Sequence, residues 1–401
     1  MPEEKLNIDE RFKLIRITSR RYGKAGRAEK SKILDHLVEQ TGVSRKTLIR
    51  RLNGACVRKR RKRQRGHKYG AGVDDALRVI SESCNYICAE RLQPNLVWLA
   101  RHLDRHSELT LEPEVEELLG QISTATVRRI LQRIHQDRPR RRRASGFSSD
   151  ARSQIPVRRI PWDTRAPGHF EVDLVFHCGP QASGEFVYSL VMVDVATGWC
   201  ECAALLGKSY RGMSDAFARC LMRCPVPVLE VHTDNGSEFF SAHLLNFWKE
   251  RAQVPDLSRS RPYRKNDNRY VEHRNGALVR AWLGHDRIDT AQQTIALNKL
   301  YTRLWLYFNF FQPVMHLAHK HWDGQRVVRV HDTARTPFDR MVQAGVLSAA
   351  QTRELAALRD SCNPRRLRDE LWDAVMQLYD MQPAVDGVTE DVFATLLPSR
   401  H

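Results

Sequence analysis

The chain has 401 residues, which predicts roughly two to four domains. Its net charge of +18 lies wholly in one part: residues 1–160 carry 37 Lys and Arg against 19 Asp and Glu, whereas the rest carries 28 of each. This asymmetry predicts that the N-terminal part binds a polyanion, with a merely basic surface as the alternative. The sequence has no N-terminal apolar signal, no apolar run of membrane length and no CxxC pair, so we expect a reduced cytoplasmic protein without membrane contact or structural zinc.

The first predicted element is a helix-turn-helix inside a domain at 1–65. A helix and a tight turn precede Ser44, an expected N-cap, and a second helix is predicted over 45–53. Because Leu48 and Leu52 take the buried face, the basic residues of this helix face outward, as in helices that enter a DNA major groove. A helical hairpin without DNA contact is the alternative. The residues predicted to contact DNA are Arg45, Lys46, Arg50 and Arg51.

A basic run at 58–65 ends this domain, and we predict that it follows phosphates without reading sequence, with a solvated linker as the alternative. A second helical domain is predicted over 66–138, and its last helix, capped by Ser123, is again typical of a helix-turn-helix. A basic linker at 139–160 follows and is predicted to lie along DNA. The residues assigned to DNA contact here are Arg58, Lys59, Arg60, Arg61, Arg128, Arg129, Arg133, Arg140, Arg141, Arg142 and Arg143.

A domain of mixed strands and helices is predicted over 161–290. Its first three strands are separated by short Gly-containing turns, which predicts an antiparallel meander. A helix, a fourth strand and another helix follow. The predicted strands are 170–176, 186–195, 199–205 and 226–233, and the predicted helices are 209–223 and 242–251.

Three acidic residues of this domain are candidates for one site. Asp173 lies in an apolar strand on the same face as Glu171, and a buried acid is costly unless it is paired or binds a cation. Asp234 follows the fourth strand, directly before an Asn-Gly turn, with helix capping as its alternative role. Glu272 lies in the first turns of a continuous predicted helix. Asp194 is a rival candidate, but its place before an Ala-Thr-Gly turn favours a structural role.

The C-terminal region, 291–401, is predicted to be mainly helical. Thr290 is placed as the cap of a long helix whose aromatic side chains are expected in the core. Short strands are predicted near 322–330, and two helices are predicted at 348–361 and 365–381. Because this region is close to neutral, with 13 Lys and Arg against 12 Asp and Glu, we expect it to serve packing or assembly, with DNA binding as the alternative.

The three acids resemble, in order and spacing, the acidic triad of the DDE transposases and retroviral integrases, with 60 and 37 residues between them. Around them, Thr233-Asp234-Asn235-Gly236-Ser237-Glu238-Phe239 and Lys265-Asn266-Asp267-Asn268, with Val271, Glu272 and Asn275, are similar to bacterial insertion-sequence transposases with an integrase-like core. The match is close over about 162–283. It departs from many relatives at Val279, where a basic residue is common seven positions after the Glu; here Arg280 follows instead.

The resemblance implies an α/β fold with a ribonuclease-H-like (integrase-type) catalytic core, N-terminal helix-turn-helix domains and a mainly helical C-terminal region. It further implies a DNA transposase that is cytoplasmic and nucleoid-associated, and that cleaves and joins DNA strands in transposition. The implied partners are double-stranded DNA, both element ends and target, and further copies of this chain.

In such enzymes two Mg²⁺ ions, with Mn²⁺ as a substitute, are held by the triad, so the resemblance implies that Asp173 bridges both ions while Asp234 and Glu272 each hold one. The alternative is a non-catalytic, sequence-specific DNA-binding regulator with a degenerate core. A tyrosine or serine recombinase is a further rival, and it would form a covalent protein–DNA intermediate.

Overall fold

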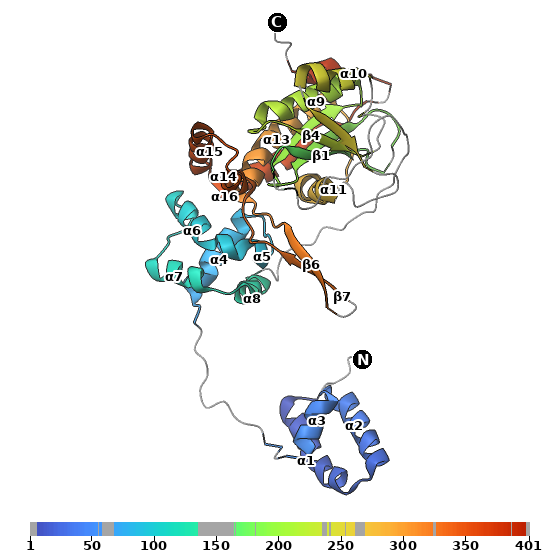
Figure 1. Cartoon of the computed structure of the whole chain (residues 1–401), viewed down its shortest axis with the longest axis vertical. Helices are drawn as coiled ribbons and strands as arrows, with labels where there is room; N and C mark the ends of the chain where they lie inside the picture. The colour runs from blue at the N-terminus through green and yellow to red at the C-terminus, as the bar shows by residue number, and fades with distance from the viewer. Residues whose placement is uncertain are drawn as a thin grey trace. The chain divides into compact units, whose positions relative to one another are not determined.

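A computed structural model shows how the chain folds (Figure 1). It divides by its internal contacts into two compact units, Met1–Lys68 and Tyr69–His401, which are described separately. The residues that the structure describes are 6–54, 56–57, 68–134, 164, 166–180, 182–234, 239, 242–252, 254–260, 269–323, 326–385 and 387–397. Within these ranges no helix combines the length and apolar character needed to cross a membrane.

The first unit is a bundle of the helices α1 (Ile8–Lys24), α2 (Arg27–Thr41) and α3 (Arg45–Leu52) around a small apolar core. The turn between α2 and α3 needs Gly42, whose φ of +64° is accessible to glycine at little cost. Ser44 occupies the N-cap position of α3, but its hydroxyl donates to the Thr47 hydroxyl instead of accepting a backbone N–H. The helix pair is therefore as predicted, but the side chain of Ser44 does not accept the backbone hydrogen bond expected of an N-cap.

The second unit begins with the helices α4 (Ala71–Ser83), α5 (Ala89–Leu92), α6 (Leu96–Arg105), α7 (Pro113–Gln121) and α8 (Thr124–Ile134). They share one apolar core. The hydroxyl of Ser123 accepts the backbone N–H of Thr126 at 3.3 Å, which confirms the predicted cap of the last helix. The side chain of Asn95 donates to the carbonyl of Ala334 at 3.1 Å, so this helical part packs against the C-terminal region.

A mixed five-stranded sheet follows, with the strand order β3-β2-β1-β4-β5. The first three strands form the predicted antiparallel meander, and β4 and β5 run parallel to β1, so the topology is that of the ribonuclease-H-like fold. The strands are β1 (His169–Phe176), β2 (Val187–Asp194), β3 (Cys200–Leu206), β4 (Glu230–Thr233) and β5 (Asp256–Arg259).

Apolar cores cover both faces of the sheet. Phe170 and Val172 of β1 pack against α9 (Tyr210–Arg223) and α10 (Ala242–Asn246), which continues as a π-helical segment, Phe247–Ala252. The core on the opposite face of the sheet includes residues of α11 (Arg269–Asn275), a π-helical turn (Gly276–Arg280), α12 (Ala281–Leu283), α13 (Ala291–Phe311) and α16 (Pro364–Asp380). The helix that carries Glu272 is thus not one regular α-helix as predicted.

The C-terminal region is mainly helical, as expected. Thr290 caps α13 in a capping box with Gln293, and the aromatic side chains of Tyr307 and Phe308 are buried, which confirms both predictions for this helix. An isolated hairpin is formed by β6 (Leu317–Asp323) and β7 (Arg326–His331). The helices α14 (Pro337–Ala344), which was not predicted, and α15 (Ala349–Ser361) precede α16, and a 3-10 turn (Val392–Thr395) follows it.

Candidate active site

Two of the three acids lie on neighbouring strands. β1 runs parallel to β4 with Val172 opposite Thr233, so Asp173 and Asp234 take the next positions along the two strands. β4 ends at Thr233, whereas β1 continues to Phe176, which places Asp234 at the strand's carboxyl end. Both acids are partly exposed. Because paired strands lie only about 4.8 Å apart, the two carboxylates can lie near each other in contact with solvent.

The third acid, Glu272, belongs to α11, and the start of this helix is bound to β1. The carboxylate Oε2 of Glu171 accepts the backbone N–H groups of Tyr270 at 2.6 Å and Val271 at 3.0 Å. Such first-turn N–H groups have no acceptor within their own helix. The Glu171 residue is 1 % exposed, so its charge is held against the positive end of the helix. One strand therefore carries Asp173 and anchors the helix that presents the exposed Glu272.

Asn275 connects α11 to β1 a second time. Its Nδ2 donates to Oδ2 of Asp173 at 2.6 Å, while the backbone N–H of Leu174 donates to Oδ1 at 2.9 Å. The Asn275 Oδ1 atom is buried and has no hydrogen-bond partner among the described residues. Asn275 follows Glu272 by three positions, so the two side chains lie on the same side of the helix.

The electrostatics of Asp173 show that the three acids influence one another. Burial raises the pKa of Asp173 to about 7; the carboxylate of Asp234 contributes to this rise, and that of Glu272 contributes less. The hydrogen bonds from Leu174 and Asn275 act in the opposite direction. A carboxyl group with this pKa is partly protonated at neutral pH, and a positive charge placed beside it would lower its pKa again.

The donor chemistry fits a hard divalent cation. The three acids offer carboxylate oxygens as ligands, and a bound cation would relieve the repulsion that Asp234 and Glu272 exert on Asp173. Among the described residues, however, no three His, Cys, Asp or Glu side chains stand close enough together to hold a metal ion. Residues 235–238 and 261–268, which flank Asp234 and α11, lie outside the described residues.

Asp194, the rival acid, has a structural role. Its carboxylate is fully buried and accepts the backbone N–H of Gly168 at 2.8 Å and both the N–H and the hydroxyl of Thr197. These bonds close the turn between β2 and β3. The expectation that this acid serves the fold is confirmed.

The predicted DNA-contact residues of α3 lie on its surface, but two of them are engaged within the first unit. Arg45 forms an ion pair with Asp35 of α2. The guanidinium of Arg51 lies 4.4 Å from the ring centroid of Phe12. The remaining two, Lys46 and Arg50, are exposed.

The predicted DNA-contact residues of α8 are also exposed, and each has a partner nearby. Arg128 pairs with Glu90, Arg133 pairs with Asp74, and Arg129 donates to the Thr126 hydroxyl at 2.9 Å. Exposed pairs of this kind contribute little to stability and are easily exchanged for phosphate contacts. The others, Arg58, Lys59, Arg60, Arg61, Arg140, Arg141, Arg142 and Arg143, lie outside the described residues.

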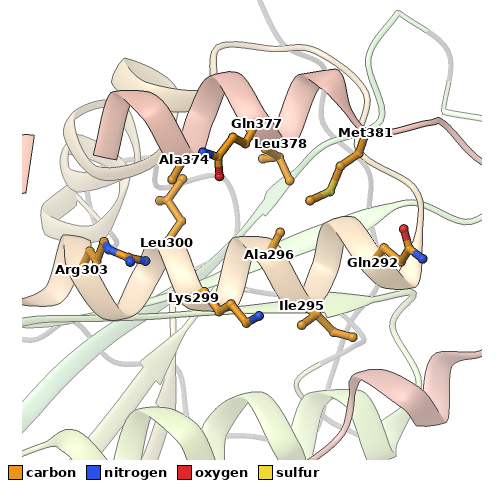
Figure 2. Close-up of a pocket in the computed structure, with 10 residues that line it drawn as sticks. All are labelled: Gln292, Ile295, Ala296, Lys299, Leu300, Arg303, Ala374, Gln377, Leu378 and Met381. Atoms are coloured by element: carbon orange, nitrogen blue, oxygen red, sulfur yellow. The ribbon is translucent and has the colours of Figure 1, made fainter. Parts of the chain in front are cut away.

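A pocket of about 350 Å³ lies between α13 and α16 (Figure 2). No acidic residue lines it, and its two cations, Lys299 and Arg303, lie among apolar and amide side chains. Arg303 pairs with Glu370 at 3.3 Å. The pocket is therefore separate from the three acids.

The sequence pattern indicates the three acids but not the contacts that bind α11 to β1. The anchoring role of Glu171 had one local signal, an acidic residue inside an apolar strand. The hydrogen bond of Asn275 to Asp173 had no local signal, because the two residues are 102 positions apart. Arg280 likewise proves to be structural: it donates to the carbonyl of Phe176 at 2.8 Å and to that of Gly284 at 3.0 Å.

Comparison with known proteins agrees with the sheet topology. Residues 163–264 match the family model of the integrase core domain. Over 338 residues the chain is 36 % identical to a protein of Sinorhizobium fredii (strain NBRC 101917 / NGR234) named "Uncharacterized protein y4rM"; the match covers 84 % of this chain and 96 % of that protein. A crystal structure of the catalytic core domain of BIV integrase is similar with 16 % identity and a TM-score of 0.29, covering 44 % of this chain and 95 % of that one. This chain therefore belongs to one family with the y4rM protein, and its residues 163–264 form an integrase core domain.

Proposed function

We propose that this protein is a DNA transposase that binds the ends of a mobile element and cleaves and joins DNA strands with Asp173, Asp234 and Glu272 as its catalytic acids. The observation that carries the proposal is the geometry of the integrase core: β1 and β4 place Asp173 and Asp234 at neighbouring positions, and Glu171 and Asn275 bind the helix of Glu272 to β1. Acids with unrelated structural roles would each be bound by local partners of their own, as Asp194 is bound by Gly168 and Thr197.

In the proposed mechanism Asp173, Asp234 and Glu272 would hold two divalent ions, and these ions would neutralise charge at the attacking oxygen, the scissile phosphate and the leaving oxygen. The protein's own groups prepare this site. Asn275 orients the Asp173 carboxylate and favours its ionised form. Glu171 fixes the first turn of α11 and so the position of Glu272. No protein nucleophile takes part, since water or a DNA 3′-hydroxyl attacks the phosphate.

The DNA would be double-stranded element ends and target DNA. The N-terminal helices supply the sequence-reading surface in this proposal, with the exposed Lys46 and Arg50 of α3 and the three arginines of α8 as contacts. A multimer on paired ends in the nucleoid completes the proposal. The domain limits 1–65, 66–138, 139–160, 161–290 and 291–401 remain a proposal as well.

The direct test is an assay of strand cleavage and joining on a duplex that carries an element end. We expect activity with Mg²⁺ or Mn²⁺ and none with EDTA, and we expect Asp234→Asn and Glu272→Gln each to reduce the rate by at least about 10³-fold, since each removes a charge that acts in the transition state. Asp256→Asn, a change in a partly buried acid of β5, is the matched control and is expected to leave the rate unchanged.

Three outcomes contradict the proposal. Wild-type rates in either triad variant would show that the acids are not catalytic. A covalent protein–DNA adduct formed in EDTA would indicate a serine or tyrosine recombinase instead. Specific binding to element ends with no cleavage under any metal would favour the non-catalytic regulator.

Asn275→Ala is expected to shift the pH dependence of the same reaction. The Asn275 hydrogen bond lowers the pKa of Asp173, so its loss raises that pKa, and the acidic limb of the pH–rate profile moves to higher pH. The profile of the variant, measured at saturating Mg²⁺, is compared with that of Asn298→Ala, which removes a similar amide in α13 that donates to the Ala204 carbonyl. An unchanged acidic limb in Asn275→Ala would contradict the assigned role.

A further inference from the structure

The β6–β7 hairpin is a two-stranded sheet that extends away from the five-stranded sheet (Figure 1). Every residue of β6 from Ala318 to Asp323 is exposed. A two-stranded hairpin is at best marginally stable in water by itself. Its persistence therefore depends on how its root is held, and its exposed side chains are available to a partner.

The root of the hairpin, formed by residues 314–316 and 332–335 on either side of it, is held rigidly. The guanidinium of Arg340, which is nearly buried, donates two hydrogen bonds to the carboxylate of Asp332, at 2.8 and 2.9 Å. That carboxylate also accepts the backbone N–H of His316 at 2.8 Å. Below it, Val314 and Arg335 form an antiparallel bridge. A buried bidentate Arg–carboxylate pair fixes both geometry and register, so the arm is held firmly where it leaves the body.

This root adjoins the helix that presents Glu272. The ring of His316 lies edge-on to the ring of Tyr270, with 6.2 Å between the ring centroids. Tyr270 is the residue whose N–H is bound by Glu171 at the start of α11. The arm therefore begins beside the proposed catalytic helix.

One face of the arm carries two cations and an indole. Lys320 is paired in register with Arg329, and Trp322 is paired with Val327, so alternation places these four side chains on one face. Like charges directly opposite each other destabilise a hairpin. Across the described residues, no carboxylate lies within ion-pair distance of Lys320 or Arg329. Trp322 is 72 % exposed.

We propose that the β6–β7 hairpin is a DNA-binding arm, in addition to the acids and the predicted N-terminal readers. The proposal rests on the proposed function as a DNA-processing enzyme. Lys320 and Arg329 contact phosphates, which removes their mutual repulsion, and Trp322 packs its indole against the sugars and base edges. A two-stranded ribbon fits the B-DNA major groove. The phosphate contacts are independent of sequence, so the arm binds target and element DNA alike.

The test measures binding of the full-length protein, in EDTA to prevent cleavage, to labelled element-end and unrelated duplexes over a range of KCl concentrations. The double variant Lys320→Gln/Arg329→Gln is expected to bind both duplexes about tenfold more weakly, with a plot of log affinity against log salt that is less steep by about 2, since each phosphate contact contributes about 0.9. Trp322→Ala is expected to weaken binding about fivefold with an unchanged salt slope.

The matched control is Lys299→Gln/Arg353→Gln, which removes the same charge from exposed positions of α13 and α15. Equal losses in the control and the arm variant would overturn the proposal, as would wild-type affinity in the arm variant. A changed oligomeric state by light scattering, with unchanged DNA binding, would identify the arm as a protein interface and also overturn it. If the wild-type protein binds no DNA, the proposed function itself is wrong. If the wild type binds DNA and the arm variant binds it equally well, only the proposal for the arm is wrong.

Discussion

Asp173→Asn is expected to abolish strand cleavage and joining and, at the same time, to stabilise the metal-free protein at pH 8. Activity is lost because the substitution removes the charge that both proposed metal ions require, and we expect a rate decrease of at least about 10³-fold. Stability increases because desolvation of the Asp173 carboxylate, together with the charges of Asp234 and Glu272, makes its ionisation costly in the folded state. A residue that served only the fold would show the opposite effect on stability.

The pH dependence gives the sign of this effect. The folded-state pKa of Asp173 is about 7, above its ordinary value of 3.8, so the folded protein holds this proton more tightly than the unfolded chain does. Its contribution to stability is therefore complete below about pH 4 and is lost as the pH rises through 7. The Asn variant lacks this loss, so the variant and the wild type differ little at pH 4 and by at most about 4 kcal/mol at pH 8.

Thermal unfolding of both proteins in EDTA between pH 5 and pH 8 measures the difference. Added Mg²⁺ at pH 8 is expected to raise the Tm of the wild type but not that of the variant, because only the wild type gains a ligand that binds the folded state. Asp75→Asn, at an exposed position of α4, serves as the control and should change neither activity nor Tm. A less stable Asp173→Asn protein at pH 8 would contradict the electrostatic account.

The parts of the fold that the sequence predicted are those with strong local patterns. The meander of β1, β2 and β3 follows from apolar runs separated by Gly-containing turns, and the start of α13 follows from the Thr290 cap. The strand β5 was missed because its four residues include only one that is buried, Ser258, so it has no apolar pattern. The strand β4 begins four residues later than predicted, at Glu230, because the two prolines before it cannot donate to a ladder.

The candidate site was found by the spacing of its acids, whereas its internal connections depend on long-range contacts. The prediction that Glu171 and Asp173 share a face of β1 is confirmed, since both hydrogen-bond to α11. The partner of Glu171 could not be predicted, because it is a pair of backbone N–H groups 99 and 100 residues away. Backbone donors leave no trace in the residue types of a sequence.

Glu171→Ala is therefore expected to reduce catalysis strongly without touching a catalytic acid. The substitution leaves the N–H groups of Tyr270 and Val271 without an acceptor in the interior, which costs about 1–3 kcal/mol of stability. It also releases the first turn of α11, where Glu272 follows directly, and a displacement of about 1 Å in such a group can lower the rate about 10²-fold. We expect a decrease of this size in kcat and a higher Mg²⁺ concentration at half-maximal activity.

Two further variants separate positioning from simple destabilisation. Glu171→Gln keeps an oxygen that accepts the same two N–H groups and loses only the charge near the helix N-terminus, so it should retain most of the activity. Val375→Ala, at a buried position of α16, should destabilise the fold while leaving the Mg²⁺ dependence unchanged, because it leaves the anchor of α11 intact. If Glu171→Ala changes stability alone, or if Glu171→Gln is as inactive as Glu171→Ala, then the two backbone hydrogen bonds are not what places Glu272. In the second case the charge of Glu171 itself would have to act in the reaction, as a fourth acid beside the other three.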